Sequence, residues 1–434
     1  MKQETTSRLV MTSRTPLALL VFLLALQLVT PSAVWTILLA GLATALGLSF
    51  FWLRRLAVNV SSTRRQRGAL VVAGDVLEEE WALSNAGALP VLVAEIVDHS
   101  TLPDYAVNRV VAVGGNAAVT WRTHGICRQR GLFIIGPWTV AMADPFGFFR
   151  LEQTYAVEQS ILVYPRVAIL PPLQLPRGGA SGRARAMRKA LESELSVASV
   201  RHYAPGDSLR HIAWGVSAHR DALMVREFDQ EPAGDLWIVL DLDAAVQVGH
   251  GMDGTEEFAI VLVASLAAEW LRRNRAVGVA AFGQEAVLVP PQRGEAQLWR
   301  ILHELARVQA APDWPLARTL EAVRSSLGRG ITLAVVTPST GADWLSPLLH
   351  LQGRGVATAA LLLDTGSFTQ PAATTPSPAS LDLRSALAQH GVTTHVVDRR
   401  LMSLRPAVTY RRKRMGLRTL ATGRVIDVDI EEEV

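Results

Sequence analysis

The sequence predicts a doubly wound α/β domain, preceded by an all-β sandwich domain and, at the N-terminus, a transmembrane helical hairpin. Three observations lead to this fold class. Two apolar runs adjoin at residues 16–30 and 33–53, short apolar runs separated by turn residues fill residues 56–170, and strand and helix patterns alternate from residue 236 to residue 397. These patterns are typical of spanning helices, sandwich strands and parallel-sheet units, respectively.

The composition indicates a membrane segment and excludes several kinds of site. Hydrophobic residues make up 49% of the chain, which is high for a soluble protein. The formal net charge of +4 is modest, so it fits a membrane surface or an acidic protein partner, and no nucleic acid partner is expected. The single cysteine, Cys127, excludes an intramolecular disulfide and any CxxC metal or redox motif.

Residues 1–55 are predicted to form the transmembrane hairpin, with helices at about 12–30 and 33–53. The second run has about the 20 residues that a spanning helix needs, whereas the first is short and has to borrow from the segment before it. Pro31 and Ser32 leave room only for a tight turn. Basic residues flank the hairpin on both sides and are absent from this turn: Lys2, Arg8, Arg14, Arg54, Arg55, Arg64, Arg65 and Arg67. This distribution places both termini and the main body in the cytoplasm.

A cleaved signal peptide over the first apolar run is the alternative interpretation. Lys2 and the arginines would form its basic end, Ala33 offers a weak cleavage context, and the body would then lie outside the cell. The adjoining second run continues the apolar pattern without the polar start of a secreted protein. This continuity favours the hairpin.

Residues 56–170 are predicted to form the β-sandwich domain. Leu77, Trp81 and Leu83 fall on one side of a strand, because successive side chains point to opposite faces. Further short runs are separated by Gly, Asn and Pro, which is typical of a sandwich; the candidate strands are 91–97, 117–122, 132–142 and 159–164. The segment Asp144–Phe149 is interpreted as a turn that closes this domain. An apolar plug under a loop is favoured over a binding role for it.

Two segments are too polar or too rich in glycine and proline to build a core. Residues 171–199 combine prolines, a glycine pair and several basic residues, and are predicted to be a basic flexible linker. Residues 401–434 form a charged C-terminal tail with a basic block at 411–414 and an acidic block at 427–433. Opposed blocks of this kind are typical of a solvated tail or of one that folds back on itself.

Residues 200–231 contain the densest group of charged, histidine and aromatic residues in the chain, together with a Pro-Gly pair. A Pro-Gly pair before Asp207 predicts a type II turn, and Asp207 or Ser208 is suited to cap a short helix. Four residues fall on one face of that helix by their spacing: Leu209, Ile212, Ala213 and Val216. Arg210 precedes Trp214 by four residues, which places a guanidinium over the indole. A strand follows at 223–228.

Residues 200–400 together are predicted to form the α/β domain. The predicted strands are 236–242, 276–282, 331–336, 357–363 and 393–397. The predicted helices are 256–273, 295–308, 316–327, 344–352 and 381–390. The first strand is apolar throughout and ends in acid, as a buried parallel strand does. The loop 369–380 is rich in Pro, Thr and Ser, and is predicted to be disordered.

The pattern around Trp214 resembles the signature of the bacterial domain-of-unknown-function 58 family: Arg-x-Tyr-x-Pro-Gly-Asp, then Arg-x-Ile-x-Trp, then an Arg and a Val-Arg-Glu-Phe strand. The matching residues are Arg201, Tyr203, Pro205, Gly206, Asp207, Arg210, Ile212, Trp214, Arg220, Arg226, Glu227 and Phe228. The resemblance implies a von Willebrand factor A-like α/β domain in a bacterial inner-membrane protein. It also implies association with MoxR-type AAA+ ATPases and transglutaminase-like membrane proteins as partners.

The resemblance also implies where a metal would bind. Functional members of that fold bind a divalent cation with Asp-x-Ser-x-Ser after the first strand. Here the segment starts with Asp241 and Asp243, but both serines are replaced. Asp313 stands where the fold offers a Thr, and Thr337 follows a strand without the acid that the fold carries there. Either a weak Mg²⁺ binds Asp241, Asp243 and Asp313, or the site is degenerate and metal-free; no other cofactor is predicted.

The leading hypothesis is a membrane-anchored adaptor that is not an enzyme. It lies in the lipid bilayer and presents the α/β domain to a MoxR-type AAA+ ATPase, with a transglutaminase-like membrane protein as a further partner. The predicted partner-binding residues are basic, aromatic or turn-forming: Arg201, Tyr203, Asp207, Arg210, Trp214, Arg220 and Arg226. No catalytic residue is assigned, because the chain has no G-x-x-x-x-G-K-[ST], G-x-S-x-G or H-E-x-x-H motif.

Two alternatives belong to other functional classes. One is a hydrolase or transferase whose active site includes Asp207 and the neighbouring arginines. The other is a divalent-cation-dependent adhesion protein outside the cell, which the missing serines and the basic flanks of the hairpin disfavour.

Overall fold

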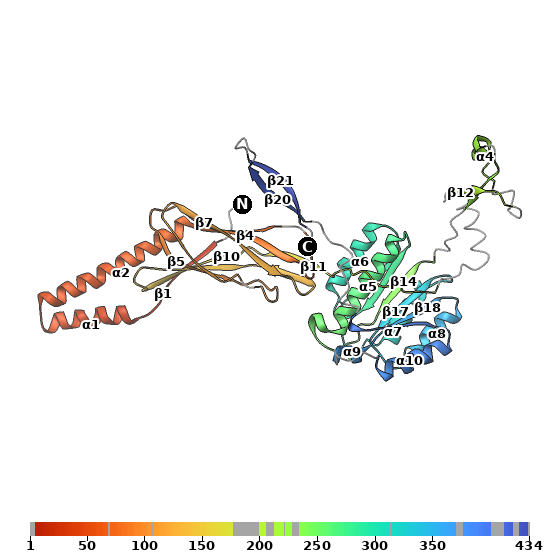
Figure 1. The fold of residues 1–434 in the computed structure, drawn as a ribbon. Helices are drawn as coiled ribbons and strands as arrows, with labels where there is room; N and C mark the ends of the chain where they lie inside the picture. Colours follow the sequence, from red (N-terminus) through yellow and green to blue (C-terminus); the bar gives the residue numbers. More distant parts are fainter. Residues whose placement is uncertain are drawn as a thin grey trace. The chain divides into compact units, whose positions relative to one another are not determined.

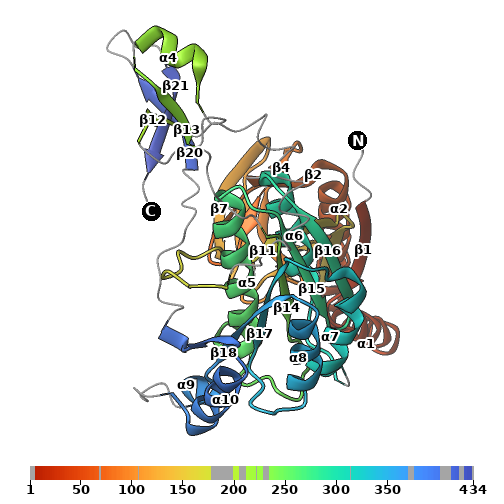
Figure 2. The same ribbon diagram turned by 90° about the vertical axis from the view of Figure 1, so that its right-hand side faces the viewer.

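The computed structural model (Figures 1 and 2) divides the chain into two compact units, Met1–Pro165 and Arg166–Val434. Two separate clusters of buried hydrophobic residues form the cores, one in each unit. The structure describes residues 5–67, 70–105, 107–176, 199–204, 212–220, 222–227, 234–312, 314–369, 376–400, 412–419 and 425–432.

The first unit opens with a strand and two apolar helices: β1 Thr5–Met11, α1 Thr15–Val29 and α2 Ala33–Asn59. The predicted start of the first helix, at about residue 12, is too early. Residues 9–11 belong instead to β1, which pairs antiparallel with β10 (Phe149–Tyr155). Helix α1 begins one residue before Pro16, because a proline ring suits the first turn of a helix and not its interior.

Only one helix in the described part of the chain, α2, is long and apolar enough to cross a membrane by length and composition. Helix α1 is apolar but has 15 residues, about 22 Å at the rise of an α-helix, and the hydrocarbon core of a bilayer is about 30 Å thick. The two helices pack against each other (Figure 1) and carry many exposed apolar side chains. The second helix therefore meets the predicted spanning length and the first does not.

The rest of the first unit is rich in β-structure, as predicted. Its three sheets have the strand orders β1-β10-β9-β5-β6, β2-β4-β7 and β3-β11-β8. The remaining strands are β2 Val60–Arg67, β3 Val71–Val72, β4 Val76–Asn85, β5 Val91–Asp98, β6 Arg109–Val113, β7 Ala117–Ile126, β8 Gly131–Ile135, β9 Trp138–Ala143 and β11 Gln159–Tyr164. The candidate strand 132–142 is in fact two strands, since Pro137 has no N–H to donate and Gly136 adopts a φ of 85°.

The core of the first unit joins the sheets to the second half of α2. Leu77, Trp81 and Leu83 are buried on one face of β4, as the period of two predicted. Leu53 and Leu56 of α2 are buried in the same core. Burial of such large apolar side chains is the main stabilising contribution to a fold. The C-terminal part of α2 is therefore an integral element of the β-rich unit.

The turn Asp144–Phe149 between β9 and β10 is not the apolar plug that the sequence predicted. The Asp144 carboxylate accepts hydrogen bonds from the amides of Phe146 (3.0 Å) and Phe149 (2.7 Å), which holds the turn. The side chain of Phe146 is left 57% exposed and stacks on Phe148, with ring centroids 5.7 Å apart. Phe146 therefore faces away from the core.

The second unit contains a six-stranded sheet of order β16-β15-β14-β17-β18-β19. Its strands are β14 Leu236–Leu240, β15 Val277–Phe282, β16 Ala286–Gln292, β17 Thr332–Thr337, β18 Ala357–Leu363 and β19 Thr393–Val397. All neighbours pair in parallel except β16, which is antiparallel to β15. The chain starts in the middle of the sheet at β14 and extends first to one edge and then to the other. This is the predicted doubly wound topology.

Helices lie on both faces of this sheet (Figure 2). They are α5 Thr255–Arg272, α6 Glu295–Arg307, α7 Leu316–Val323, α8 Leu345–Gly353, α9 Thr365–Thr369 and α10 Pro378–Gln389, with short 3₁₀ helices at Gly251–Asp253 and Arg324–Ser326. Part of the predicted loop 369–380 is thus helical, because Ser377 caps α10 by accepting a hydrogen bond from the Ser380 amide.

The antiparallel edge strand β16 was not predicted. It contains Pro290 and Pro291, and proline within an apolar run argues against a strand in the interior of a sheet. An edge strand tolerates proline, because one side of its backbone has no partner strand to bond.

The predicted linker, the signature segment and the C-terminal tail are described only in part by the structure. The start of the linker, residues 171–176, is held by hydrogen bonds from Thr332 Oγ1 to the Pro176 carbonyl (3.1 Å) and between His395 Nε2 and the Gln174 carbonyl (2.9 Å); residues 177–198 lie outside the described part. The remaining elements are β12 Ser199–His202, α4 Trp214–Arg220, β13 Met224–Glu227, β20 Arg412–Thr419 and β21 Val425–Glu432. In the tail β20 and β21 pair antiparallel, so the basic block lies opposite the acidic one.

Candidate functional site

The signature residues form a small element that we call the signature hairpin: strands β12 and β13 with helix α4 between them. The predicted helix includes Ile212 and Ala213, but α4 begins only at Trp214. Ile212 forms a bridge with Val225, and the Ala213 amide donates to the Met224 carbonyl at 2.8 Å. Both side chains are buried by this pairing. The two apolar residues that were predicted to lie on a helix face therefore pack against strand β13 instead.

A buried serine fastens α4 to the strand that follows it. The Met224 amide donates to Ser217 Oγ at 2.9 Å, and both residues are buried. This contact fixes which side of α4 faces the strand. The opposite side of the helix is consequently presented to solvent.

The outer side of α4 carries the exposed residues of the signature hairpin. Trp214 is 64% exposed, and His219 and Arg220 lie exposed in the last turn. A tryptophan is rarely left this exposed, and exposed aromatic residues beside basic ones are typical of protein interfaces. The outer side of α4 therefore combines an exposed aromatic side chain with exposed basic ones.

The other predicted partner-binding residues are placed less completely. Tyr203 is half-buried, and its amide donates to the Leu223 carbonyl at 2.8 Å. The backbones of Arg201 and Arg226 lie in β12 and β13. Asp207 and Arg210 lie outside the described residues. The predicted stacking of Arg210 on Trp214 and the alternative active site around Asp207 fall on these undescribed positions.

The acid predicted at the end of the first strand, Asp241, lies at the carboxyl edge of the sheet and is 1% exposed. Thr337, at the end of the neighbouring strand β17, donates its hydroxyl to Asp241 Oδ2 at 2.5 Å, and the Asp243 amide donates to Oδ1 at 3.1 Å. Burial raises the pKa of Asp241 to about 6, against the opposing effect of these two hydrogen bonds. Both carboxylate oxygens therefore already have protein donors.

Hydrogen bonds within the protein also hold the loop that follows Asp241. Asp243 Oδ1 accepts a hydrogen bond from the Ala245 amide at 3.0 Å, and the Ala244 amide donates to the Ala311 carbonyl at 3.0 Å. Asp313 lies outside the described residues. Within the described ranges there is no group of three or more His, Cys, Asp or Glu that could hold a metal ion. Because Asp313 is not described, the structure does not bring the three predicted ligands together, and the weak Mg²⁺ site stays a prediction.

An aromatic stack that the sequence reading missed starts at the end of the strand next to β14. Phe282, the last residue of β15, stacks on Trp314 with ring centroids 5.3 Å apart, and the Arg318 guanidinium lies 3.8 Å from the centroid of the Trp314 ring. The four-residue spacing of Trp314 and Arg318 is the signal that could have indicated it.

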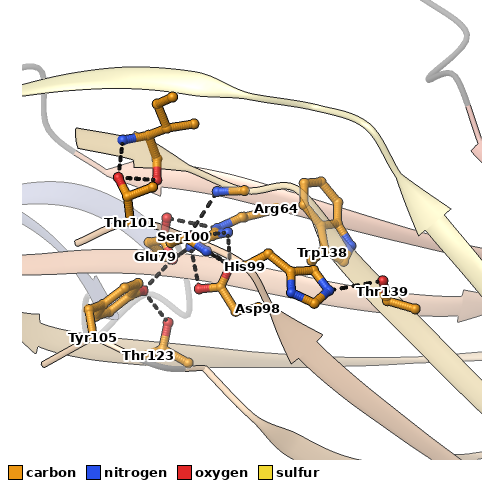
Figure 3. Close-up of polar contacts among 12 residues, drawn as sticks. Arg64, Glu79, Asp98, His99, Ser100, Thr101, Tyr105, Thr123, Trp138 and Thr139 are labelled. Carbon is orange, nitrogen blue, oxygen red and sulfur yellow. Dashed lines mark hydrogen bonds and ion pairs between the residues drawn. The ribbon is translucent and has the colours of Figure 1, made fainter. Parts of the chain in front are cut away.

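A second missed feature is a cluster of buried charges in the first unit (Figure 3). The Arg64 guanidinium donates to both carboxylate oxygens of Glu79, at 2.8 to 3.0 Å, and to both of Asp98, at 2.8 and 3.1 Å. It also lies 4.6 Å from the centroid of the Trp81 ring. The Tyr105 hydroxyl donates to Glu79, and burial, followed by the negative charge of Glu79, raises the pKa of Tyr105.

The position of Glu79 was the available signal for this cluster. Glu79 lies between Leu77 and Trp81 on the inward-facing side of the alternating β4 pattern. Its carboxylate is fully enclosed by Arg64 and Tyr105. The carboxylates of Glu79 and Asp98 are thus paired with the Arg64 guanidinium, and loss of that partner would leave buried charges uncompensated.

Comparison with known proteins identifies one matching family, described as "Protein of unknown function DUF58", over residues 199–373. YeaD of Bacillus subtilis, an uncharacterized protein, is 26% identical over 193 residues, which cover 44% of this chain and 45% of YeaD. Rv1480 of Mycobacterium tuberculosis, also uncharacterized, is 25% identical over 171 residues, 38% of this chain and 53% of Rv1480. The chain spans about half the length of these curated relatives.

Among solved structures, a von Willebrand factor type A protein from Catenulispora acidiphila is similar, with 11% identity and a TM-score of 0.25, over 38% of this chain and 39% of that one. The CARDB domain of PF1109 from Pyrococcus furiosus is also similar, with 15% identity and a TM-score of 0.19, over 24% of this chain and 90% of that one. The matched segment of the family includes the signature hairpin and the Asp241 edge of the sheet. Residues 199–373 therefore carry the similarity of this chain to the DUF58 family.

Proposed function

We propose that the protein is a membrane-anchored adaptor whose DUF58 domain, a degenerate von Willebrand A-like domain, recruits a protein partner. The observation that supports this proposal best is the exposure of Trp214, 64%, on a helix whose other side is fastened by Ser217. A rigidly held, exposed tryptophan gives a large binding contribution at small entropic cost.

The carboxyl edge of the sheet supports binding over catalysis. Asp241 is held by Thr337 and by the Asp243 amide, so it does not present a free carboxylate to a substrate. In doubly wound folds ligands bind at this edge, and the stack of Phe282, Trp314 and Arg318 offers a second apolar and basic contact there.

Anchoring in the lipid bilayer is supported by α2 and by the pairing of β1. Helix α2 has the length and composition of a spanning helix. Strand β1 precedes the two apolar helices, and β10 follows them, yet the two strands are neighbours in one sheet. A pair of helices that leaves one folded unit and returns to it enters and exits the bilayer on the same side, and the flanking basic residues favour the cytoplasmic side of a bacterial inner membrane. The β-rich unit, in our proposal a sandwich, then acts as a spacer.

The proposed partner is a MoxR-type AAA+ ATPase, which the resemblance of the signature implies. A transglutaminase-like membrane protein is the second expected partner. The exposed His219 and Arg220 beside Trp214 favour a partner with an acidic, apolar-bearing surface.

Co-purification from native membranes tests this proposal. The tagged full chain carries either Trp214→Ala or the control Leu288→Ala, which removes a side chain 48% exposed on the edge strand β16. We expect Trp214→Ala to reduce the captured ATPase by about 30-fold, the effect of a central interface residue, and Leu288→Ala to leave capture unchanged. Equal capture by wild type and Trp214→Ala, with an unchanged melting temperature, would show that the signature hairpin is not the docking surface.

A further inference from the structure

One end of the β-rich unit exposes apolar side chains beside the two apolar helices. Phe146 is 57% exposed in the turn Asp144–Phe149, and Leu92 and Val93 are 44% and 47% exposed at the start of β5. Because Ala94 pairs with Met142, the start of β5 lies beside the end of β9, where this turn begins. These exposed residues thus share one end of the sheet.

The same turn closes an apolar groove against the helices. Pro16, Leu19 and Phe22 of α1, Leu42 of α2 and Phe148 of the turn line this groove. Its walls are almost entirely apolar and it is open on one side. A flexible hydrocarbon chain fits such a groove, whereas a polar ligand would lose its hydration there without gaining hydrogen bonds.

The lengths of the two helices set the depth of this end relative to a bilayer. From Ala33 to Arg54, α2 rises about 32 Å, close to the thickness of the hydrocarbon core, whereas α1 rises only about 22 Å. The helices are joined by three residues and pack together. When Arg54 reaches the headgroups, the start of α1 therefore still lies about 10 Å deeper.

The pairing of β1 with β10 places the turn Asp144–Phe149 at the same depth in the bilayer as the start of α1. Met11, at the end of β1, lies opposite Phe149 of β10, so the entrance to α1 and the turn are adjacent. Phe149 also packs edge-on against Phe50 of α2, with ring centroids 6.2 Å apart. The Arg54 guanidinium lies 6.0 Å from the Phe50 ring centroid, one helical turn further along α2 toward the headgroups, where a cation can meet lipid phosphate.

We infer that this end of the β-rich unit, with Leu92, Val93, Phe146 and Phe148, enters the boundary between headgroups and acyl chains of the bilayer, and that a phospholipid acyl chain occupies the groove beside Phe148. The inference rests on the proposed anchoring by α1 and α2. It explains why an apolar end remains exposed and why the first helix is too short to span. The protein is then a partly immersed unit rather than a soluble domain on a tether.

Nitroxide labels in proteoliposomes of phosphatidylcholine and phosphatidylglycerol test the immersion. Single-cysteine variants of the full chain, in a Cys127→Ala background, place the label at Phe146→Cys, at Ile37→Cys on α2, or at Leu132→Cys on β8. Leu132 is a matched control, since it is 58% exposed and its strand β8 bonds Thr101, beyond the opposite end of β5, at 2.8 Å.

We expect the labels at Ile37 and Phe146 to collide with dissolved oxygen more often than with a water-soluble nickel complex, and the label at Leu132 to show the reverse. A buried label at Ile37 with a water-exposed label at Phe146 overturns the inference and leaves the anchoring intact. A water-exposed label at Ile37 overturns both.

Lipid retention tests the groove itself. Leu42→Trp fills the groove, whereas Leu38→Trp, on an α2 residue that is 47% exposed and does not line it, is the control. In native mass spectrometry of the detergent-extracted chain, we expect wild type and Leu38→Trp to retain one phospholipid, and Leu42→Trp to retain at least tenfold less. Equal retention by the two variants would refute an acyl chain in this groove.

Discussion

Both units bury carboxylates, but they neutralise them in different ways. In the β-rich unit Glu79 and Asp98 share the Arg64 guanidinium, whose side chain is 5% exposed. Burial lowers the pKa of Arg64, but the hydrogen bonds and charges of the two carboxylates outweigh it and raise the pKa overall. In the α/β unit Asp241 has only the Thr337 hydroxyl and a backbone amide.

Because of this difference, the charge of the buried groups depends on pH in one unit and not in the other. A guanidinium between two carboxylates keeps its charge at every physiological pH, so the β-rich unit relies on a permanent ionic cluster. A carboxylate held by neutral donors in an apolar site gains or loses a proton near pH 6. The α/β unit therefore contains a buried group that titrates within the physiological range. The two arrangements lead to different expected losses on mutation.

The largest effect should follow from Arg64→Met, which leaves two buried carboxylates without their cation. We expect the free energy of unfolding of the β-rich unit to fall by about 3–5 kcal/mol. Hydrogen exchange measured by mass spectrometry should show lost protection in β4 and unchanged protection in β14. Arg150→Met is the control, because its ion pair with Glu95 is largely exposed and should contribute less than about 1 kcal/mol. Equal losses in β4 and β14 would contradict the independence of the two cores.

A smaller effect should appear as a pH dependence of the α/β unit. The folded pKa of Asp241 is about 6, above its unfolded value of about 3.9, so the folded state binds the proton more tightly. The contribution of this group to stability is complete below about pH 4 and is lost as the pH rises to about 6, a change on the order of 3 kcal/mol.

Urea titrations between pH 4 and pH 8 measure this loss. Asp241→Asn does not titrate, so we expect the stability of the wild type relative to this variant to decrease with rising pH. A difference between the two proteins that is constant over this range would show that Asp241 has an ordinary pKa.

The smallest effect should come from divalent cations. Both Asp241 oxygens already accept hydrogen bonds, so we expect 10 mM Mg²⁺ or Mn²⁺ to leave the melting temperature unchanged. A site with a Kd near 1 mM would add about 1.4 kcal/mol at this concentration. A melting temperature that rises in the wild type and not in Asp241→Asn would show that Asp241 binds a metal ion despite its hydrogen bonds. The buried carboxylates of both units would then be neutralised by cations.

Apolar periodicity was enough to predict much of this fold. The alternation of Leu77, Trp81 and Leu83 and the apolar run before Asp241 each predicted a strand correctly, because burial on one or both faces leaves a local trace in the sequence. The position of Asp241 at the end of its strand followed from the same run.

The elements that depend on distant partners could not be predicted in this way. Strand β1 is mostly exposed and has no alternation, so only β10, far along the chain, makes it a strand. Ile212 and Ala213 have helical spacing, yet Val225 and Met224 pair with them. The Arg64 cluster requires β2 and β4 to be in register, with Arg64 opposite Trp81 and next to Glu79. Local patterns carry no information about these contacts.

The pairing of β1 with β10 has a consequence for biosynthesis. Thr5 pairs with Tyr155, so β1 cannot join its sheet until β10, the last strand of that sheet along the chain, has been made. The two apolar helices follow β1 directly and, in the proposed anchored state, enter the bilayer long before then. The β-rich unit should therefore close around helices that are already inserted, and contacts over such long sequence separations form slowly. Assembly of the anchor would precede folding of the body it holds.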